Sequence, residues 1–454
     1  MDTQSYDIAV IGLGPGGEMV AGRLAREGVS VLAVDHRLVG GECPYWGCIP
    51  SKMMVRAAGA LAEARYVPRL AGRTGDIVPD WGPVADRIRD EATDDWDDTA
   101  AVDRLVKSGA AFVRGTGRIR GPHEIEVDEQ IYRVGRGIVV NTGTTPLIPP
   151  IEGIADVDAW TNHDLVEARE LPASMVILGG GTIGCEFGQA LARFGVTVAI
   201  VEAGPRLLAH EEPEASDRLR DVFDAEGIEV RLGAAATKVT ERDGHVELSF
   251  EDGTTVTGER LLVAVGRRVD PSAVGLDRVG VDPTAQRVPV DDRCRVTDQV
   301  WAVGDITGKG AFTHVSMYQA AIVVRDVLEQ DGPAADYRAV PRVTFTDPEI
   351  GAVGLTEAQA REQGIEVRTG TVPIAETSRG FVHGPGGEGV LKVVSDADRS
   401  VLVGATAMGP AGGEVLGALS VAVHAEVPLE VLRSMIFAYP TFHRGIETAL
   451  GGLD

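Results

Sequence analysis

Short apolar runs alternate with stretches of helical periodicity along most of the chain, and glycine clusters separate them. The first apolar run, Tyr6–Ile11, precedes a glycine-rich turn, a helical stretch to about Glu27 and a second run at Val29–Val34. The same order returns with apolar runs at Met175–Leu178 and Val196–Val201. Strands that alternate with helices are typical of parallel sheets. The pattern therefore predicts an α/β protein with two doubly wound domains.

The remaining segments have different patterns. Residues 56–109 are rich in Ala, Arg and Asp with helical periodicity, which predicts surface helices, and the acidic run Asp94–Asp98 is expected to end one of them in solvent. Alternating residues from Ala110 to Val140 predict a small antiparallel sheet. From Pro341 onward, strands near residues 366–372 and 389–394 and a helical tail predict a further α+β domain.

Size and charge exclude several classes of protein. A chain of 454 residues has room for three domains of ordinary size. The net charge of −25 argues against nucleic acid or an anionic membrane surface as partner. No apolar run is long enough to span a bilayer, and the acidic start predicts no signal peptide. We therefore expect a cytoplasmic protein.

The first glycine-rich turn has the spacing of a dinucleotide-binding site. Gly12, Gly14 and Gly17 follow the first strand and open a helix, and Asp35 ends the second strand. Such glycines let the backbone approach a pyrophosphate, the helix N-terminus attracts it, and the acid accepts from a ribose hydroxyl. An ordinary loop is the less favoured interpretation.

The second glycine-rich turn repeats this arrangement. It contains Gly179, Gly181 and Gly184, and the following strand ends at Glu202. The acid suits the free ribose 2′-hydroxyl of NADH and would repel a 2′-phosphate. The acid therefore favours NAD(H). Arg206 lies nearby, so NADP(H) stays open as the alternative. Two such units in one chain indicate two nucleotides held face to face.

Two of the four cysteines lie close together in the sequence. Cys43 and Cys48 follow Gly41, and Lys52 comes just after them. If Cys48 opens a helix, its thiolate lies at the positive end of the helix dipole, and one turn brings Cys43 into disulfide range. A structural disulfide or two unrelated core cysteines are the alternatives. Metal binding is less favoured, since no second Cys/His pair has zinc-like spacing, and we expect no metal.

This cysteine segment resembles the redox-active disulfide of the flavin-dependent pyridine nucleotide-disulfide oxidoreductases, and the resemblance covers essentially the whole chain. The family includes dihydrolipoamide dehydrogenase, glutathione reductase and mercuric reductase. Thr142 and Gly143 match a turn that closes over the flavin nucleotide, and Gly304 and Asp305 match the second flavin fingerprint. The resemblance implies FAD as cofactor. It also implies an FAD domain at 1–150 and 271–335, an NAD(P) domain at 151–270, with its exit near Gly266, and a dimerisation domain at 336–454.

The resemblance also implies an order of electron transfer. A hydride passes from NAD(P)H to FAD and then reduces the disulfide, with Cys48 as the charge-transfer thiol and Cys43 as the exchange nucleophile. Lys52 and Glu186 are expected to pair beside the flavin. The alternative for Glu186 is an acid in the first helical turn. His314 lies at the start of a helix that faces the flavin in the family. The sequence favours neither a catalytic nor a structural role for it.

One departure from the family concerns the substrate base. Disulfide-reducing members carry a histidine before a Pro-Thr pair and a glutamate soon after it. Here Tyr439 replaces the histidine and Arg444 replaces the glutamate. Tyrosine is a poor base at pH 7 but donates a proton, and Arg444 can stabilise a thiolate or an anionic substrate. His443 is a further candidate, and inert packing is the alternative for Tyr439.

The dimerisation domain implies a homodimer whose last segment enters the partner's active site, with a small molecule as substrate. Three functions remain open. The first is a reductase of a disulfide, thioether or other electrophile. One variant of this function is that of 2-oxopropyl-coenzyme M reductase/carboxylase, a family member that also lacks the histidine. The second is a diaphorase or quinone reductase that uses the flavin alone. The third is a redox-sensing dimer without catalysis. Mercuric reductase is disfavoured because residues 448–454 contain no cysteine pair.

Overall fold

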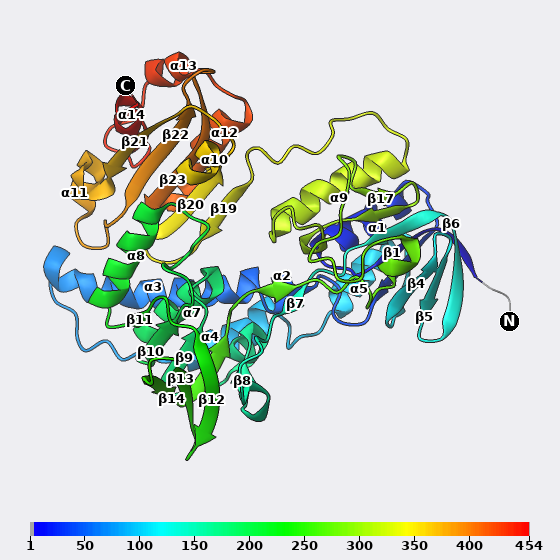
Figure 1. Ribbon diagram of the computed structural model, residues 1–454, viewed down its shortest axis with the longest axis horizontal. Helices are drawn as coiled ribbons and strands as arrows, with labels where there is room; N and C mark the ends of the chain where they lie inside the picture. The colour runs from blue at the N-terminus through cyan, green and yellow to red at the C-terminus, as the bar shows by residue number, and fades with distance from the viewer. Residues whose placement is uncertain (1–3, 454) are drawn as a thin grey trace. The chain divides into compact units, whose positions relative to one another are not determined.

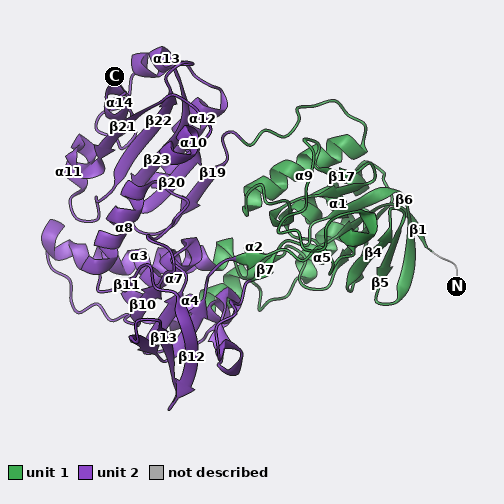
Figure 2. Ribbon diagram, in the orientation of Figure 1, with its two compact units in different colours: residues 1–50, 86–146, 267–337 green, residues 51–85, 147–266, 338–454 purple. Residues whose placement is uncertain are grey.

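The computed structural model describes residues 4–453, which form two compact units. The first unit comprises the chain up to Pro50, residues 86–146 and residues 267–337, and the second comprises residues 51–85, 147–266 and the chain from Arg338 onward (Figure 2). The chain therefore leaves the first unit and returns to it twice.

The first unit is built on a mainly parallel sheet in the order β17-β18-β6-β1-β2-β3. Strands β4 and β5 extend it through an antiparallel pairing of β5 with β6. The strands are β1 (Ser5–Ile11), β2 (Val31–Asp35), β3 (Ala111–Arg114), β4 (Gly117–Gly121), β5 (Glu124–Val127), β6 (Gln130–Val140), β7 (Thr145–Pro146), β16 (Arg267–Arg268), β17 (Arg295–Thr297) and β18 (Val300–Ala302). The helices are α1 (Pro15–Arg26), α2 (Glu42–Tyr45), η1 (Ile88–Ala92), α5 (Thr99–Lys107), η3 (Leu276–Val279), η4 (Asp305–Thr307) and α9 (Thr313–Val327).

The two faces of this sheet are covered differently. Helices α1, α5 and α9 pack on one face, through buried residues such as Leu24, Leu105 and Val323. The β4–β5 hairpin and the segment around Val274 and Val288 cover the other face. The strands are buried on both faces, as expected for a parallel sheet. Because β1 and β6 are parallel, their carboxyl ends lie at the same edge of the sheet, where α1 begins (Figure 1).

The second unit contains an all-parallel sheet in the order β11-β10-β9-β15-β8. An antiparallel sheet of β12, β13 and β14 packs on one of its faces. The strands are β8 (Ala159–Trp160), β9 (Ser174–Leu178), β10 (Thr197–Val201), β11 (Glu229–Arg231), β12 (Ala236–Arg242), β13 (His245–Phe250), β14 (Thr255–Gly258) and β15 (Arg260–Val263). The helices are α3 (Cys48–Leu70), which begins in the first unit, α4 (Gly82–Arg87), η2 (Ile154–Asp156), α6 (Asn162–Glu167), α7 (Thr182–Arg193) and α8 (Pro213–Ala225).

The C-terminal part of the second unit is an antiparallel sheet in the order β19-β20-β23-β22-β21, packed against α12, α13 and α14. Its strands are β19 (Pro341–Thr344), β20 (Glu349–Gly354), β21 (Val367–Pro373), β22 (Val390–Asp396) and β23 (Val401–Gly409). Its helices are α10 (Glu357–Glu362), η5 (Ile374–Glu376), α11 (Ser378–His383), α12 (Gly412–His424), α13 (Leu429–Ser434) and α14 (Arg444–Gly451). The predicted α+β domain is confirmed.

Both strand–helix–strand units with glycine turns are confirmed, and two expectations were wrong in part. The predicted antiparallel sheet is confirmed for β4, β5 and β6, but β3 pairs in parallel with β2, because alternation specifies a two-faced strand but not the direction of its neighbour. The acidic run is exposed at Asp94, Asp95 and Asp97, as expected, but Asp98 is buried: its carboxylate accepts from the amide of Val39 at 2.7 Å and pairs with Arg114 at 2.6 Å. These contacts hold the loop after β2 against the start of α5.

Candidate active site

The first glycine turn lies where β1 ends, against the end of β6. Gly12 has φ of +88°, and a Cβ there would overlap the carbonyl oxygen of Asn141. A Cβ at Gly14 would lie 3.1 Å from Asn141 Oδ1, and one at Gly17 would overlap the carbonyl oxygen of Gly12. The three predicted glycines are therefore required for close backbone packing, which leaves the N-terminus of α1 open for a pyrophosphate.

Asp35 lies at the end of β2, as predicted, and is only 9% exposed. One carboxylate oxygen accepts from the amide of Leu13 at 2.6 Å and the other accepts from the amide of Arg37 at 2.7 Å. A carboxylate oxygen has more than one acceptor position, so each still has capacity for a ribose hydroxyl. The fixed orientation of the carboxylate fits a dinucleotide on this turn.

Asn141 is a functional residue that the sequence reasoning missed. Its Oδ1 accepts from the amide of Gly17 at 2.8 Å, and its Nδ2 donates to the carbonyl of Val303 at 2.8 Å and to Ser316 Oγ at 3.3 Å. It is 7% exposed. A polar residue that directly follows the buried strand β6, just before Thr142, is the signal that was available.

The second flavin fingerprint follows β18. Gly304 has φ of +84°, and its amide donates to Gln319 Oε1 at 2.7 Å. Burial raises the pKa of the Asp305 carboxyl, while Arg267 acts in the opposite direction. The guanidinium of Arg267 donates to Thr144 Oγ1 and to the Thr144 carbonyl, both at 2.7 Å. A buried carboxyl with a nearby cation, at the edge that holds the glycine turn, fits the polar part of a flavin nucleotide.

The turn between β6 and β7 contains the predicted Thr142 and Gly143. Gly143 has φ of +63°, and a Cβ there would meet open space, so the backbone conformation rather than crowding favours glycine. The residues of both fingerprints thus meet at one edge of a single sheet. They fit FAD, since a helix N-terminus attracts phosphates and the carboxylates of Asp35 and Asp305 can accept from hydroxyls.

The cysteine segment packs directly on this glycine turn. A Cβ at Gly41, where φ is +67°, would overlap the Cα of Gly14, and the amide of Gly40 donates to the carbonyl of Leu13 at 2.7 Å. Cys43 lies in the single-turn helix α2, and Cys48 is the first residue of α3, as predicted. The close approach of two glycines therefore brings the cysteines to the nucleotide edge.

The two cysteines are not joined in a disulfide in the structure, and they contact each other and one hydroxyl. The Sγ of Cys48 lies 3.5 Å from Thr313 Oγ1, and Thr313 is the first residue of α9. A hydrogen bond with Cys48 and then burial raise the pKa of the Cys43 thiol well above its usual range, although Thr313 lowers it. The sulfurs thus lie where two helices begin, a position that favours negative charge. Thr313 was not predicted.

Lys52 and Glu186 form an ion pair in the second unit. The Nζ of Lys52 lies 2.8 Å from Glu186 Oε2, and the other carboxylate oxygen accepts from the amide of Phe345 at 2.8 Å. The Lys52 ammonium also lies 4.6 Å from the centre of the Phe345 ring. Glu186 is the fifth residue of α7 and is 4% exposed, so its alternative as an acid of the first helical turn was wrong.

The second glycine turn repeats the geometry of the first. A Cβ at Gly179, where φ is +114°, would overlap the carbonyl oxygen of Ala264, and one at Gly184 would overlap that of Gly179. Gly181 caps α7. Glu202 accepts from the amides of Gly180 at 2.7 Å and Gly204 at 2.6 Å. This turn also fits a dinucleotide.

The contacts of the remaining predicted residues do not assign them a role in the site. Gly266, with φ of +127°, accepts a hydrogen bond from the amide of Leu147 at 3.0 Å within the second unit. His314 is exposed, and its ring stacks on Phe312 with centroids 5.2 Å apart. It lies beside Thr313 on α9.

The segment with the replaced base is exposed. Tyr439 is 68% exposed, and the guanidinium of Arg444 lies 5.4 Å from the centre of its ring. Arg444 also pairs with Glu447 at 3.1 Å. His443 caps α14 and is partly exposed. Tyr439 is therefore not packed into the core of its own chain.

Within residues 4–453, no group of three or more His, Cys, Asp or Glu side chains is placed to hold a metal ion. Among the helices of that same range, none combines the length and the apolar character that crossing a membrane requires.

The chain is similar to known proteins over nearly its whole length. The family model for pyridine nucleotide-disulphide oxidoreductases matches residues 6–320, and the model for their dimerisation domain matches residues 340–450. The chain is 32% identical to a dihydrolipoyl dehydrogenase of Halobacterium salinarum, over 98% of this chain and 96% of that protein. It is also 32% identical to a mercuric reductase of Streptomyces lividans, over 98% of this chain and 95% of that protein.

A solved structure agrees over the whole length. The HOCl-induced flavoprotein disulfide reductase RclA from Escherichia coli aligns with a TM-score of 0.86 at 26% identity, over 99% of this chain and all of that chain. The nucleotide turns, the close cysteine pair and these matches lead to one conclusion. The chain belongs to the pyridine nucleotide-disulphide oxidoreductases and is an FAD- and pyridine nucleotide-dependent flavoprotein oxidoreductase with a dimerisation domain that supports a homodimer.

Proposed function

We propose that Cys43 and Cys48 form the redox-active disulfide through which this enzyme passes two electrons from a pyridine nucleotide to a small-molecule acceptor. The observation that carries this proposal is the contact of the two thiols with each other and with Thr313, where α3 and α9 begin. FAD, when bound, relays the hydride of the nicotinamide as two electrons. Two electrons and two protons convert the disulfide to the dithiol.

The two thiols have different roles. Cys48 holds the negative charge of the reduced pair, because the helix N-termini favour an anion and the Cys43 thiol is available as a hydrogen-bond donor to it. Cys43 retains its proton and attacks the acceptor only after it loses that proton. Lys52, paired with Glu186, supplies a fixed positive charge one helical turn after Cys48.

The acceptor step lacks an ordinary base. We place Tyr439 of the partner subunit in the position that the family histidine occupies, with Arg444 and His443 beside it. A tyrosine with a pKa near 10 donates a proton but does not accept one from Cys43 at neutral pH. Acceptors that need a proton after attack, or that take electrons without thiol attack, therefore suit this site better than acceptors whose reduction depends on a base that deprotonates Cys43. Disulfides, thioethers and other electrophiles form this class.

NADH is the proposed donor. Glu202 presents its carboxylate beside the second glycine turn, where a 2′-phosphate would be repelled. The guanidinium of Arg206 donates to the carbonyls of Ala209 at 2.7 Å and Glu211 at 3.2 Å, so these bonds would have to break before it could bind a phosphate. These contacts support NAD(H) over NADP(H).

The proposed assignment of domains to cofactors follows the family. Residues 1–150 and 271–335 would bind FAD, residues 151–270 would bind NAD(H), and residues 336–454 would form the homodimer that completes each active site. A cytoplasmic location is part of this proposal, because a reducing compartment keeps an exposed cysteine pair under the control of the enzyme's own electron donor.

A second function is favoured by one observation. The retained proton on Cys43, without a base to take it, would slow any thiol attack. A diaphorase or quinone reductase that uses the flavin alone would not need that step. The non-catalytic alternative is the least supported, because the thiol pair and the Lys52–Glu186 pair are both in place.

The test is an anaerobic titration of the purified flavoprotein with NADH and, separately, with NADPH. Visible absorbance and a thiol count are recorded at each step. We expect a long-wavelength charge-transfer band and two new thiols after two electrons, at lower concentration with NADH. Bleaching of the flavin without new thiols would leave the flavin-only reductase as the function.

A further inference from the structure

The loop between β10 and α8 directly contacts the second glycine turn. The amide of Leu208 donates to the carbonyl of Gly180 at 2.9 Å, and the amide of Gly204 donates to Glu202 at 2.6 Å. The position of this loop, residues 203–212, therefore fixes both the turn and the acid that would receive the adenosine ribose. Any group that holds the loop also acts on the nucleotide site.

The conformation of the loop is not one that its own sequence favours. Leu208 has φ of +47°, in the left-handed region that a leucine rarely adopts, and its side chain is 5% exposed. A residue keeps such a conformation only when the surrounding structure enforces it. Contacts inside the loop contribute, since the amide of Glu211 donates to the carbonyl of Leu208 at 2.8 Å, and contacts from outside residues 203–212 add to them.

Two ion pairs connect the end of the loop to the antiparallel sheet of the C-terminal part. The guanidinium of Arg342, on β19, binds both carboxylate oxygens of Glu211, at 2.7 and 2.9 Å. The ammonium of Lys392, on β22, lies 3.0 Å from Glu212. Both Lys392 and Glu212 have side chains that are only 3% exposed.

Lys392 is surrounded by carboxylates. Its ammonium also lies 2.8 Å from Glu214 at the start of α8 and 2.9 Å from Glu357 on α10. The second carboxylate oxygen of Glu212 accepts from the amide of Glu357 at 2.7 Å. Without the Lys392 charge, three carboxylates would face one another, so one lysine holds the loop and the first turn of α8 together.

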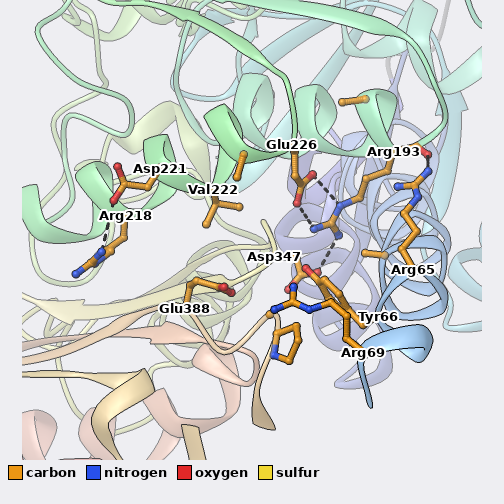
Figure 3. Close-up of a pocket in the computed structure, with 15 residues that line it drawn as sticks. Arg65, Tyr66, Arg69, Arg193, Arg218, Asp221, Val222, Glu226, Asp347 and Glu388 are labelled. Carbon is orange, nitrogen blue, oxygen red and sulfur yellow. Dashed lines mark hydrogen bonds and ion pairs between the residues drawn. The ribbon is translucent and has the colours of Figure 1, made fainter. Parts of the chain in front are cut away.

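The far end of α8 is held in the same way. Figure 3 shows Arg193 between Glu226, which caps α8, and Asp347, which precedes β20. The distances are 2.6 Å to Glu226 and 2.8 Å to Asp347. These residues line a pocket of about 490 Å³. Helix α8 is thus tied at both ends to the part of the chain that matches the dimerisation domain.

We propose that Arg342 and Lys392 are positioning residues for the pyridine nucleotide, which act through Glu211 and Glu212 on the loop at residues 203–212. The inference rests on the proposed placement of the nucleotide at Gly179–Gly184 and Glu202. The dimerisation part then contributes to nucleotide affinity from within the same chain, in addition to its role in assembly.

The experiment uses the FAD-loaded dimer of Arg342→Met, Lys392→Met and Lys392→Arg. The binding of NAD⁺ is measured by titration calorimetry, and hydrogen–deuterium exchange is followed in residues 203–212. We expect the dissociation constant of NAD⁺ to rise about tenfold in both methionine variants, with faster exchange in the loop, and to be largely restored in Lys392→Arg. FAD content is expected to remain unchanged.

Two controls separate the possible outcomes. Glu426→Gln breaks ion pairs to Arg338 at 2.6 Å and Arg399 at 2.5 Å in the same part of the chain and is expected to leave NAD⁺ affinity unchanged. Glu202→Gln is expected to weaken NAD⁺ binding. If it weakens binding while folded Arg342→Met and Lys392→Met remain within twofold of the wild type and Arg342→Met shows no faster loop exchange, the positioning role is wrong. If Glu202→Gln has no effect, the proposed nucleotide site is itself wrong.

Should Lys392→Met not fold, Arg342→Met decides the matter, because Arg342 and Glu211 are more exposed than Lys392 and their loss is less costly to the fold. A tenfold weaker NAD⁺ affinity in that variant supports the proposal. An unchanged affinity with unchanged loop exchange overturns it.

Discussion

The hydroxyl of Thr313 contacts the sulfur of Cys48 and lowers the pKa of Cys43, against the hydrogen bond and burial that raise it. Thr313→Val keeps the shape and removes the hydroxyl. We expect the pKa of the Cys43 thiol to rise further, by about one unit, the size of one hydrogen bond to a charged group. A thiol with a higher pKa ionises only at higher pH, so the alkylation profile of the reduced enzyme moves upward in pH.

The measurement for Thr313→Val is the rate of iodoacetamide reaction against pH, with the modified cysteine identified by mass spectrometry. Thr307→Val is a matched control, because Thr307 lies in the same unit and its hydroxyl donates to the Gly304 carbonyl at 2.8 Å rather than to a sulfur. An unchanged profile in Thr313→Val would show that this hydroxyl does not act on the cysteine pair.

Replacement of Cys43 by serine separates the two candidate functions. Cys43→Ser removes the exchange nucleophile but leaves the nucleotide turns and Cys48 intact. If the disulfide mechanism holds, reduction of thiol-reactive acceptors falls by at least about a hundredfold, because covalent attack is lost. Reduction of a quinone or dye by NADH is expected to continue. Steady-state assays with both kinds of acceptor on one preparation provide the measurement, and equal retention of both activities would favour the flavin-only enzyme.

At the scale of elements, the Lys52–Glu186 pair connects α3 to α7. Glu186→Gln keeps an acceptor for the amide of Phe345 and removes the charge that pairs with Lys52. Because Lys52 is 36% exposed, the lost pair costs less than a fully buried one, and we expect about 2 kcal/mol of lost stability.

Thermal unfolding of the flavoprotein measures the lost stability. Rapid mixing with NADH measures the rate of flavin reduction, which we expect to be slower in Glu186→Gln. Glu447→Gln serves as the control, because its pair with Arg444 is exposed and is expected to cost less than 1 kcal/mol. Equal unfolding temperatures for the two variants would contradict the structural importance of the α3–α7 pair.

The features that could be predicted from the sequence are those that depend on residues nearby in the chain. Gly12 and Gly179 were found because a positive φ and a crowded neighbour demand glycine at a fixed spacing from a strand. Cys48 at a helix start followed from the run after it. Asn141 and Thr313 were missed, because their partners lie 124 and 265 residues away in the chain.

Direction and burial were the less predictable properties. The alternation in β3 specifies two faces but not a parallel neighbour. Asp98 belongs to an acidic run that would ordinarily be solvated, yet Val39 and Arg114 bury it. Both errors arise from tertiary contacts that no local pattern encodes. The same holds for Lys392, which looks like an ordinary strand lysine until three carboxylates surround it.

At the scale of the whole molecule, the chemistry is divided between the two units. The cysteine pair and the first nucleotide turn lie in the first unit, while Lys52, Glu186 and the second turn lie in the second. Helix α3 belongs to both, since it begins with Cys48 and continues beyond Pro50. In our proposal the acceptor step also depends on a second chain.

The replaced base can be restored as a test of that dependence. Tyr439→His, alone and with Arg444→Glu, places a group with a pKa near 6.5 where the family histidine lies. A positioned general base contributes about 10²–10⁴-fold, so we expect at least a tenfold gain in turnover of a small disulfide by the double variant. The gain should appear as pH rises through about 6.5, because only neutral histidine accepts the Cys43 proton.

Tyr439→Phe is the matched control and should show no such gain, since it has neither a base nor a hydroxyl. A mixed dimer, in which one chain carries Cys43→Ser and the other carries Tyr439→His, distinguishes the source of the base. If the histidine acts across the dimer, it reaches the cysteine pair of the other chain, which is the disabled one. The mixed dimer then shows no gain, whereas a dimer with both changes on one chain and neither on the other retains it. A gain only in the first arrangement would mean that Tyr439 serves its own chain and that the shared active site is wrong.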